Sequence, residues 1–287
     1  MHCETLSIER PSEAAAEIGE AARRRLFSVW GEPLFVADWL RPVFIHYEVP
    51  AAELQRDLPF ELDLREGKAY VSLVAFTMRG MRPFHGGRLA AWLCRPIAGN
   101  EYLNVRTYVR HRGEPGIYFL TEWMNNPFSV RLGPLTFGLP YRFGALNYRH
   151  WCEEGVLAGE AREKTSLFRY EATPVKSGTS NTEHQTSNNE RVPRRGRENG
   201  GDFIPCPAGS LDAFLLERYT AFTAHNGKRR FFRIWHPSWM QQAIRISVTD
   251  RSLLAGVWPW FSRATLVGGN YSPGARDVWM GRPHRIS

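Results

Sequence analysis

Lysine is scarce in this sequence, and its scarcity restricts the chemistry that the chain can carry out. The 287 residues include 37 lysines and arginines, of which 33 are arginine. The four lysines are Lys68, Lys164, Lys176 and Lys228. They fall at the start of a hairpin strand, on a polar strand face, in a loop and after a turn. None is predicted to be desolvated enough to hold a neutral, nucleophilic amine at pH 7.

Cysteine and long apolar runs are also scarce. The four cysteines are Cys3, Cys94, Cys152 and Cys206, and they stand far apart with no CxxC or CxxH spacing. The longest candidate membrane stretch, residues 253–261, contains Pro259 and is far shorter than the ~20 residues that span a bilayer. Residues 1–20 lack a basic and then apolar signal pattern. We therefore expect reduced thiols, a cytoplasmic protein and no membrane partner.

Signature motifs of the common enzyme classes are missing too. The sequence has no GxxxxGKS/T, no GxGxxG after a strand, no GxSxG and no HExxH. The usual signals of a phosphate cradle, a dinucleotide site, a hydrolase elbow and a zinc protease are therefore absent. The nine histidines never stand at i, i+4 with a carboxylate partner. We expect neither a metal nor any other cofactor.

What the sequence does contain is the composition of an ordinary globular protein with positive charge. Hydrophobic residues make up 43%, charged residues 23%, and the formal net charge is +8. The basic residues are scattered, apart from short runs at residues 23–25, 191–197 and 228–230. No zinc-finger spacing, recognition-helix pattern or aromatic RNA-binding strand accompanies them. We therefore expect solvated surface charge and no nucleic-acid partner.

Hydrophobic periodicity divides the chain into a helical start and a long β region. Residues 13–27 have the pattern of an amphipathic helix rich in Ala, Glu and Arg. Strands are predicted from residue 43 onward, including hairpins within residues 61–76 and 102–124. Further helices are predicted at residues 126–136 and 211–222.

One segment differs in composition from the rest. Residues 176–202 hold a single apolar side chain, Val192, among polar residues and glycines. Such a segment cannot bury enough surface to offset its ordering entropy, and a disordered insertion is predicted. The predicted organisation is a helical extension, residues 1–28, followed by one mostly antiparallel β domain, residues 29–287.

The predicted strand at residues 101–110 carries polar side chains in strict alternation. Asn104 and Arg106 share one face, while Leu103 and Val105 occupy the other. In an open sheet the polar face meets water. In a closed, barrel-like sheet it lines a cavity, where a desolvated Arg106 offers a planar fork of donors to a carboxylate. The pattern itself is compatible with both arrangements.

Two histidines lie in apolar segments, and each has two interpretations. His46 is either an acid/base group or a hydrogen-bonded core residue. His236 stands between Trp235 and Trp239, where buried aromatic surroundings shift a pKa as a catalytic histidine requires. Packing alone explains His236 equally well. We keep it as a candidate substrate-binding residue.

Five stretches together resemble a known family. They are LP at 58–59, GKAYVSLVAF at 67–76, NVRTYVR at 104–110, LPY at 139–141 and GSLDAFLLERY at 209–219. In combination they resemble the YqjF-like family, an uncharacterised domain-of-unknown-function family of the acetoacetate-decarboxylase-like superfamily. The resemblance implies an α+β, mostly β fold. In this fold a curved antiparallel sheet closes into a barrel-like double cone around a cavity, with a few peripheral helices.

The resemblance also implies where a site would lie. The founding superfamily member decarboxylates a β-keto acid through a Schiff base on a lysine, and a second lysine depresses the pKa of the first. In the matching stretch here, Tyr141 stands at the position of the nucleophile and Arg142 at that of its neighbour. Neither side chain forms an imine, so the decarboxylase mechanism is not implied. Arg41 and Glu101 lie nearest to the positions of the superfamily's site arginine and glutamate.

Two hypotheses for function follow. In the first, the cavity takes a small oxo or unsaturated carboxylic acid, held by Asn104 and Arg106 under the positive potential of Arg142. Tyr141, stabilised as a phenolate by Arg142, would donate or accept the proton in a proton-transfer, hydratase or lyase step without an imine. In the second, the barrel is a non-catalytic small-molecule-binding or scaffold protein. The oligomeric state stays open, a homo-oligomer included.

Overall fold

The computed structural model describes residues 13–150, 155–175 and 203–286. The polar insertion predicted at residues 176–202 lies outside the described residues, as do Cys3 and Cys152. Helix α1 (Glu13–Phe27) forms at the expected N-terminal stretch. The division into an extension, residues 1–28, and one domain, residues 29–287, stays a prediction. Among the described helices, none combines the length and the apolar character needed to cross a membrane.

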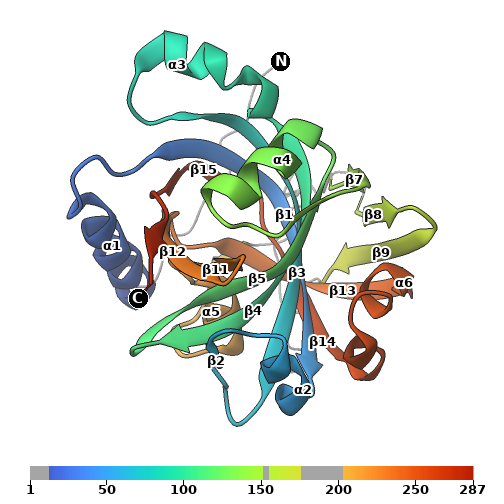
Figure 1. Ribbon diagram of the computed structural model, residues 1–287. Coiled ribbons are helices and arrows are strands. Elements are labelled where there is room, and N and C mark those ends of the chain that lie inside the picture. The colour runs from blue at the N-terminus through green and yellow to red at the C-terminus, as the bar shows by residue number, and fades with distance from the viewer. Residues whose placement is uncertain (1–12, 151–154, 176–202, 287) are drawn as a thin grey trace, which may run out of the picture.

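Seven strands form a closed ring at the centre of the molecule (Figure 1). Around the ring they are β15 (Gly274–Met280), β12 (Lys228–Trp235), β11 (Thr220–His225), β5 (Glu114–Met124), β4 (Asn100–His111), β3 (Ala69–Pro83) and β1 (Phe35–Val49). The ring closes because β1 pairs antiparallel with β3 along one edge and with β15 along the other. Only β11 and β5 pair in parallel among these neighbours. Closure removes the free sheet edges that invite aggregation.

The sheet continues beyond the ring as a second, smaller layer. From β1 it runs through β14 (Thr265–Tyr271), β13 (Met240–Asp250), β9 (Ser166–Pro174), β8 (Leu157–Glu163) and β7 (Ala145–Arg149). Four short strands attach at the edges: β2 (Glu61–Leu62), β6 (Tyr141–Phe143), β10 (Ile204–Pro205) and β16 (His284–Arg285). The mostly β architecture agrees with the fold expected from the sequence.

A bend in β1 allows this strand to pair both with a strand of the ring and with a strand of the second layer. Its first half pairs with β15, and its second half, from Val43, pairs with β14. Between them Arg41 adopts a left-handed backbone conformation with φ 51°, and the pairing with β3 shifts register between Leu40 and Val43. Such a bulge re-aims the strand. The bend therefore separates the ring from the second layer.

Side chains alternate along the ring strands, so that successive residues pack into two separate hydrophobic cores. Leu103 and Val105 of β4 pack in the core between the ring and the second layer. Tyr102 and Tyr108, which face the other way, pack in the core inside the ring. The polar face predicted for β4 therefore points into the ring and not into bulk water.

Short helices connect the strands, both at the ends of the ring and in the second layer (Figure 1). They are α2 (Ala51–Arg56), α3 (Gly87–Leu93), α4 (Pro127–Thr136), α5 (Leu211–Leu216) and α6 (Ser252–Ala255), with 3₁₀ turns η1 (Arg95–Ile97) and η3 (Pro259–Arg263). The side chain of Asn126 caps α4, as predicted, by accepting from the amides of Phe128 and Ser129. In Figure 1, α3 and α4 lie together at the top of the ring and α2 lies at the bottom.

The helix predicted at residues 211–222 is only half right. Helix α5 ends at Leu216, and the chain enters β11 at Thr220. Phe222 continues the helical spacing of apolar residues, yet it is buried as part of β11, paired with Phe231 of β12. Tertiary strand pairing thus overrides a local helical pattern whose last turn contains the β-branched Thr220.

Candidate functional site

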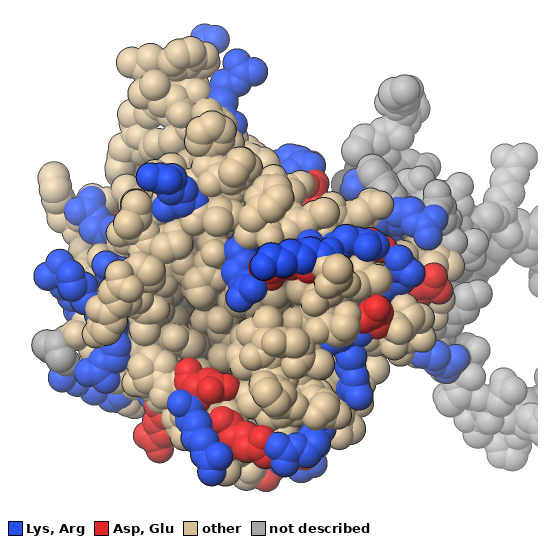
Figure 2. Space-filling model, turned by 45° about the vertical axis from the view of Figure 1, so that its right-hand side comes forward, with Lys and Arg blue, Asp and Glu red and all other residues tan. Residues whose placement is uncertain are grey.

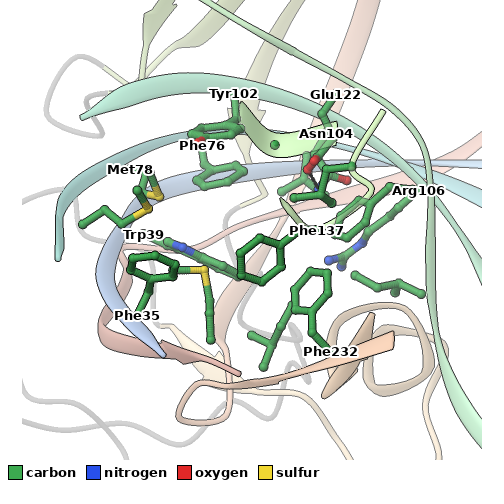
Figure 3. A pocket seen from close by; sticks show the side chains of 18 of the residues that line it. Phe35, Trp39, Phe76, Met78, Tyr102, Asn104, Arg106, Glu122, Phe137 and Phe232 are labelled. Atoms are coloured by element: carbon green, nitrogen blue, oxygen red, sulfur yellow. Dashed lines mark hydrogen bonds between the residues drawn. The ribbon is translucent and has the colours of Figure 1, made fainter. Parts of the chain in front are cut away.

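A cavity of about 360 Å³ lies inside the ring and opens beside α4. Its wall is mainly apolar, and many of the side chains that line it are aromatic or thioether groups (Figure 3). These are Phe35, Trp39, Phe44, Phe76, Phe119, Phe137, Phe232, Trp239, Met78, Met81 and Met280. An apolar wall with few polar groups is typical of a small-molecule site.

Three polar side chains gather at one end of the cavity, on two neighbouring strands. Asn104 and Arg106 project from β4, and Glu122 projects from β5 (Figure 3). Asn104 and Glu122 are direct partners in the antiparallel register of these strands. The Asn104 amide nitrogen donates to Glu122 Oε1 over 2.7 Å. The remaining side-chain oxygens, Asn104 Oδ1 and Glu122 Oε2, are buried and have no hydrogen-bond partner among the described residues.

Burial changes the acidity of Glu122. Its side chain is almost fully buried, and the loss of hydration raises the pKa of the carboxyl to about 8. The hydrogen bond from Asn104 and the charge of Arg106 lower the pKa of Glu122, but by less than burial raises it. Glu122 is therefore mostly protonated at neutral pH and titrates close to it. This is the range in which a carboxyl can both donate and accept a proton in catalysis.

Arg106 is a buried cation that forms no ion pair with any acidic residue in the described part of the chain. Its Nη2 donates to the backbone carbonyl of Leu215 over 3.1 Å, and its Nε has no hydrogen-bond partner among the described residues. The guanidinium lies 5.8 Å from the centre of the Phe44 ring. Arg218, which also reaches the cavity wall, forms an ion pair with Asp63 over 2.8 Å. Of these two buried arginines, Arg106 is the one whose charge is left for a bound anion.

Tyr141 lines the cavity, as the superfamily position suggests. Its ring packs against α4, where Gly133 leaves no room for a Cβ, and it meets the ring of Tyr102 edge-on with centroids 6.3 Å apart. Burial, together with the nearby Tyr102 and Glu122, raises the pKa of Tyr141 well above its usual range. The phenol stays protonated. The expectation that Tyr141 acts through a stabilised phenolate is therefore wrong, and only a donor role fits.

Arg142 lies outside the cavity. Its guanidinium forms a two-point ion pair with Glu163, with Nε and Nη2 at 2.9 and 2.8 Å from the two carboxylate oxygens. It also lies over the outer face of Trp123. Neighbouring residues on a strand point to opposite faces. Because Tyr141 points into the ring, Arg142 points out, and the expectation that it adds positive potential to the cavity is wrong.

The two residues assigned by approximate position also lie away from the cavity wall. Glu101 pairs with Arg79 over 3.0 Å and accepts from Asn125 over 2.5 Å. It precedes Tyr102 on β4 and faces away from Asn104, so strand alternation excludes it from the polar end. Arg41 occupies the bend of β1, and its backbone carbonyl lies 2.9 Å from His150 Nδ1.

His236 does reach the cavity wall. It is buried, and its ring stacks on that of Tyr219 with centroids 4.8 Å apart and lies tilted against that of Trp239 at 4.9 Å. Burial lowers the pKa of His236, more than the charge of Glu217 raises it. The imidazole is therefore neutral, and its Nδ1 lies 2.9 Å from the Pro237 carbonyl. Backbone hydrogen bonds to Pro237 and Arg218 engage the ring, so His236 contributes mainly an aromatic surface to the wall.

His46 is a hydrogen-bonded core residue, the second of its two interpretations. Its ring nitrogens lie 2.7 Å from Ser72 Oγ and 3.0 Å from Asn270 Oδ1. Burial lowers its pKa to about 3. The Ser72 hydroxyl in turn meets Tyr108, whose OH donates to the same Leu215 carbonyl that Arg106 binds. His46 therefore belongs to the hydrogen-bond network that holds the Leu215 carbonyl next to Arg106, and it does not line the cavity.

Sequence reasoning missed Glu122, the most perturbed carboxyl at the site. The signal was present: Glu122 is the one charged residue within the mostly apolar stretch from Ile117 to Met124. What the sequence could not supply was the register that sets Glu122 opposite Asn104. A lone acid on a buried strand is as good a candidate for a functional residue as Arg106.

Lysine chemistry has no support in the described residues. No lysine lines the cavity, and Lys68, Lys164 and Lys228 are exposed. Lys68 donates to Glu48 over 2.8 Å, and this contact raises the pKa of Lys68 instead of depressing it. The same part of the chain contains no cluster of three or more His, Cys, Asp or Glu side chains that could hold a metal ion.

Comparison with known sequences identifies relatives of this chain. The family model DUF2071, described as an uncharacterized conserved protein, matches residues 36–259. The uncharacterized protein YqjF of Bacillus subtilis (strain 168) is 24% identical over 207 residues, which cover 71% of this chain and 73% of that protein. These matches confirm the resemblance seen in the sequence.

Solved structures show the same fold. An acetoacetate decarboxylase-like enzyme from Sphingomonas wittichii RW1 aligns with a TM-score of 0.56 at 14% identity, over 89% of this chain and 94% of that one. Acetoacetate decarboxylase from Legionella pneumophila aligns with a TM-score of 0.56 at 12% identity, over 99% and 98%. The enduracididine biosynthesis enzyme MppR, in complex with pyruvate, aligns with a TM-score of 0.56 at 12% identity, over 89% and 91%. At these identities the likeness establishes the fold alone.

Proposed function

The chain belongs to the DUF2071 family of uncharacterized conserved proteins with an acetoacetate-decarboxylase-like fold, and from this premise we propose that its cavity binds an oxo or unsaturated carboxylic acid and transfers a proton on it without a covalent imine. The observation that carries the proposal is the pairing of an uncompensated buried arginine, Arg106, with a protonated buried carboxyl, Glu122, at one end of an apolar cavity.

Arg106 would hold the carboxylate of the ligand. A guanidinium in an apolar wall keeps its charge and presents donors in a planar fork that matches a carboxylate. Nε is the free donor, since Nη2 is engaged by the Leu215 carbonyl. A carboxylate placed there would also offset the cost of burying the arginine charge.

Glu122 would move the proton. With a pKa of about 8 it holds a proton at neutral pH and releases it readily. Its free Oε2 is the atom that faces a ligand, because Oε1 already accepts from Asn104. Tyr141, which stays protonated, would donate a hydrogen bond to a second oxygen of the ligand. The chemistry supported by this set is proton exchange or enolisation next to a carbonyl, or protonation of an unsaturated acid.

The ligand class is supported by one neighbour of the same fold. MppR was solved with pyruvate, which is a 2-oxo acid. Pyruvate itself would leave most of a cavity of about 360 Å³ unfilled, and that cavity has an aromatic wall. A 2-oxo acid with an apolar or aromatic side chain would fill the volume better and bury more apolar area.

The experiment combines ligand binding with proton exchange. Aliphatic and aromatic 2-oxo acids are screened by thermal shift and calorimetry. The exchange of their carbon-bound hydrogen next to the keto group is followed by NMR in D₂O. Arg106→Gln is expected to abolish binding, and Glu122→Gln is expected to retain binding at neutral pH while exchange stops.

Arg142→Gln serves as the matched control, because it removes an arginine next to the site that does not face the cavity. Equal loss of binding in Arg142→Gln and Arg106→Gln would contradict the carboxylate role of Arg106. Binding without any exchange would instead favour the non-catalytic alternative, which is motivated by the absence of a complete catalytic constellation from the sequence. A borohydride-trapped lysine adduct would contradict imine-free chemistry.

A further inference from the structure

The outer surface of the two helices at the top of the ring is apolar. On α3 the side chains of Leu89, Trp92 and Leu93 point to solvent, and α3 has no buried residue at all. On α4 the exposed side chains are Phe128, Leu132 and Leu135. These six are between 47% and 71% exposed. We call them the α3–α4 face.

The spacing of these residues shows that the face is organised and not a scatter of exposed side chains. On α3 the apolar positions are i, i+3 and i+4, and on α4 they are i, i+4 and i+7, so each set forms one stripe. An amphipathic helix in a globular protein normally turns such a stripe toward the core. Here both helices turn it outward. Contiguous exposed apolar surface of this kind marks a docking site.

The two helices are held together as one platform. The Asn126 side chain, at the N-terminus of α4, donates to the Pro96 carbonyl in η1 over 2.6 Å. The turn η1 directly follows α3, and the amide of Met81 in β3 donates to the Ala98 carbonyl just after η1 over 3.0 Å. The α3–α4 face is therefore presented by a surface fixed to the ring.

The charge around the face has one sign. Arg88 and Arg95 flank the stripe of α3, Arg131 lies beside that of α4, and all three are exposed and form no ion pair with a described residue. The sequence has no Asp or Glu between Glu66 and Glu101, and none between Glu122 and Glu153. In Figure 2 the lobe at the top of the view, which is the α3 region of Figure 1, is tan and blue with no red.

We propose that the α3–α4 face docks the protein on an anionic lipid surface. Apolar side chains with an exposed tryptophan, flanked by arginines, are the pattern of a peripheral helix that lies in the headgroup region. No helix in the part of the chain that the structure describes is long and apolar enough to span a membrane, and a peripheral contact needs none. This proposal departs from the expectation of no membrane partner and does not depend on the proposed function.

A second copy of the chain fits the face less well. In a two-fold dimer the same patch meets itself, which would bring Arg88, Arg95 and Arg131 of the two copies together without a carboxylate between them. Like charges in such an interface oppose association. An anionic bilayer offers both an apolar interior for the stripe and phosphate groups for the arginines.

The α3–α4 face adjoins the mouth of the cavity. Among the residues that line the cavity, Leu132 and Thr136 of α4 are the two that are exposed. Leu132 also belongs to the α3–α4 face. The mouth of the cavity is therefore next to the surface that would meet the lipid.

The test is vesicle co-sedimentation with the full chain. We expect binding to vesicles of equimolar phosphatidylcholine and phosphatidylglycerol, little binding to phosphatidylcholine alone, and a decrease with added salt. Arg88→Gln/Arg95→Gln/Arg131→Gln should lower the partition coefficient by about fivefold for each arginine, or about 100-fold in all. The control Arg56→Gln/Arg245→Gln/Arg285→Gln removes the same charge at exposed sites outside the face and should change binding by less than tenfold.

A second variant tests the apolar stripe. Leu89→Ser/Trp92→Ser/Leu93→Ser should abolish vesicle binding with unchanged circular dichroism, because none of the three side chains is buried. Three outcomes would overturn the proposal. The first is no binding of the full chain to anionic vesicles, and the second is equal loss of binding in the two arginine triples. The third is a dimer in sedimentation velocity that the serine variant dissociates, which would assign the face to a second copy of the chain.

Discussion

Glu122→Gln measures how much the ionisation of one buried carboxyl costs the native state in free energy. Glutamine has the shape of the protonated acid and retains an oxygen to accept from the Asn104 amide, but it cannot ionise. In the native protein the pKa of Glu122 is raised from 4.5 to about 8. In the unfolded chain the carboxyl is hydrated and titrates near its ordinary value. The variant therefore differs from the parent mainly in the cost of ionisation inside the cavity.

The direction in which the free energy of unfolding changes with pH follows from the number of protons that each state binds. Between the two pKa values the native state keeps its proton while the unfolded state has lost it, so the native state binds more protons and stability falls as pH rises. The contribution of Glu122 is fully present below pH 4.5 and is lost by the time the pH passes about 8. At 1.36 kcal/mol for each unit of pKa, the full loss is about 5 kcal/mol, and the loss between pH 5 and pH 9 is about 4 kcal/mol.

The assay is urea unfolding at pH 5, 7 and 9, followed by circular dichroism. Glu122→Gln should differ from the parent by about 1 kcal/mol at pH 5 and be more stable than it by several kcal/mol at pH 9. Glu61→Gln, at an exposed position of β2, is the control and should follow the parent at every pH. Parallel curves for Glu122→Gln and the parent would refute the reasoning, because they would mean that Glu122 ionises as freely in the cavity as in the unfolded chain.

Three further predictions concern the surroundings of the site. Gly133→Ala would place a Cβ 2.2 Å from ring carbons of Tyr141, so it should lower the free energy of unfolding by about 1–3 kcal/mol in urea titrations. Arg142→Gln removes an exposed ion pair with Glu163 and should change that free energy by at most ~1 kcal/mol. His46 has a pKa of about 3, so relative to His46→Gln the parent should lose about 3 kcal/mol between pH 7 and pH 4, because the unfolded chain takes up a proton that the buried ring does not. His46→Gln should show a flatter acid limb in the same titration, and an unchanged limb would assign the acid sensitivity to other groups.

Local pattern was enough for several elements and for part of the site. The alternation within residues 101–110 placed Asn104 and Arg106 on one face, and the structure keeps them together. The cap at Asn126 and the proline after it marked the start of α4 correctly. These features depend on side-chain period and on backbone chemistry within one or two turns, which a sequence displays directly.

Features that depend on pairing between distant segments could not be read in this way. Residues 211–222 have helical spacing, yet Thr220 and Phe222 leave the helix because β12 and β5 offer strand partners. Tyr141 and Arg142 are adjacent in the sequence, and only the pairing of β6 with β5 decides which of them faces the ring. The same pairing places Arg142 within reach of Glu163.

The sequence by itself determined what this protein lacks and which polar residues share a strand face. Its four lysines all stand in polar settings, which is enough to argue against imine chemistry. Tertiary structure alone decided whether that face meets water or lines a cavity, because the decision depends on β15 closing against β1, more than 230 residues earlier. Closure removes water from Arg106 and Glu122, and this loss of hydration is the physical basis of the anion site and proton donor that we propose.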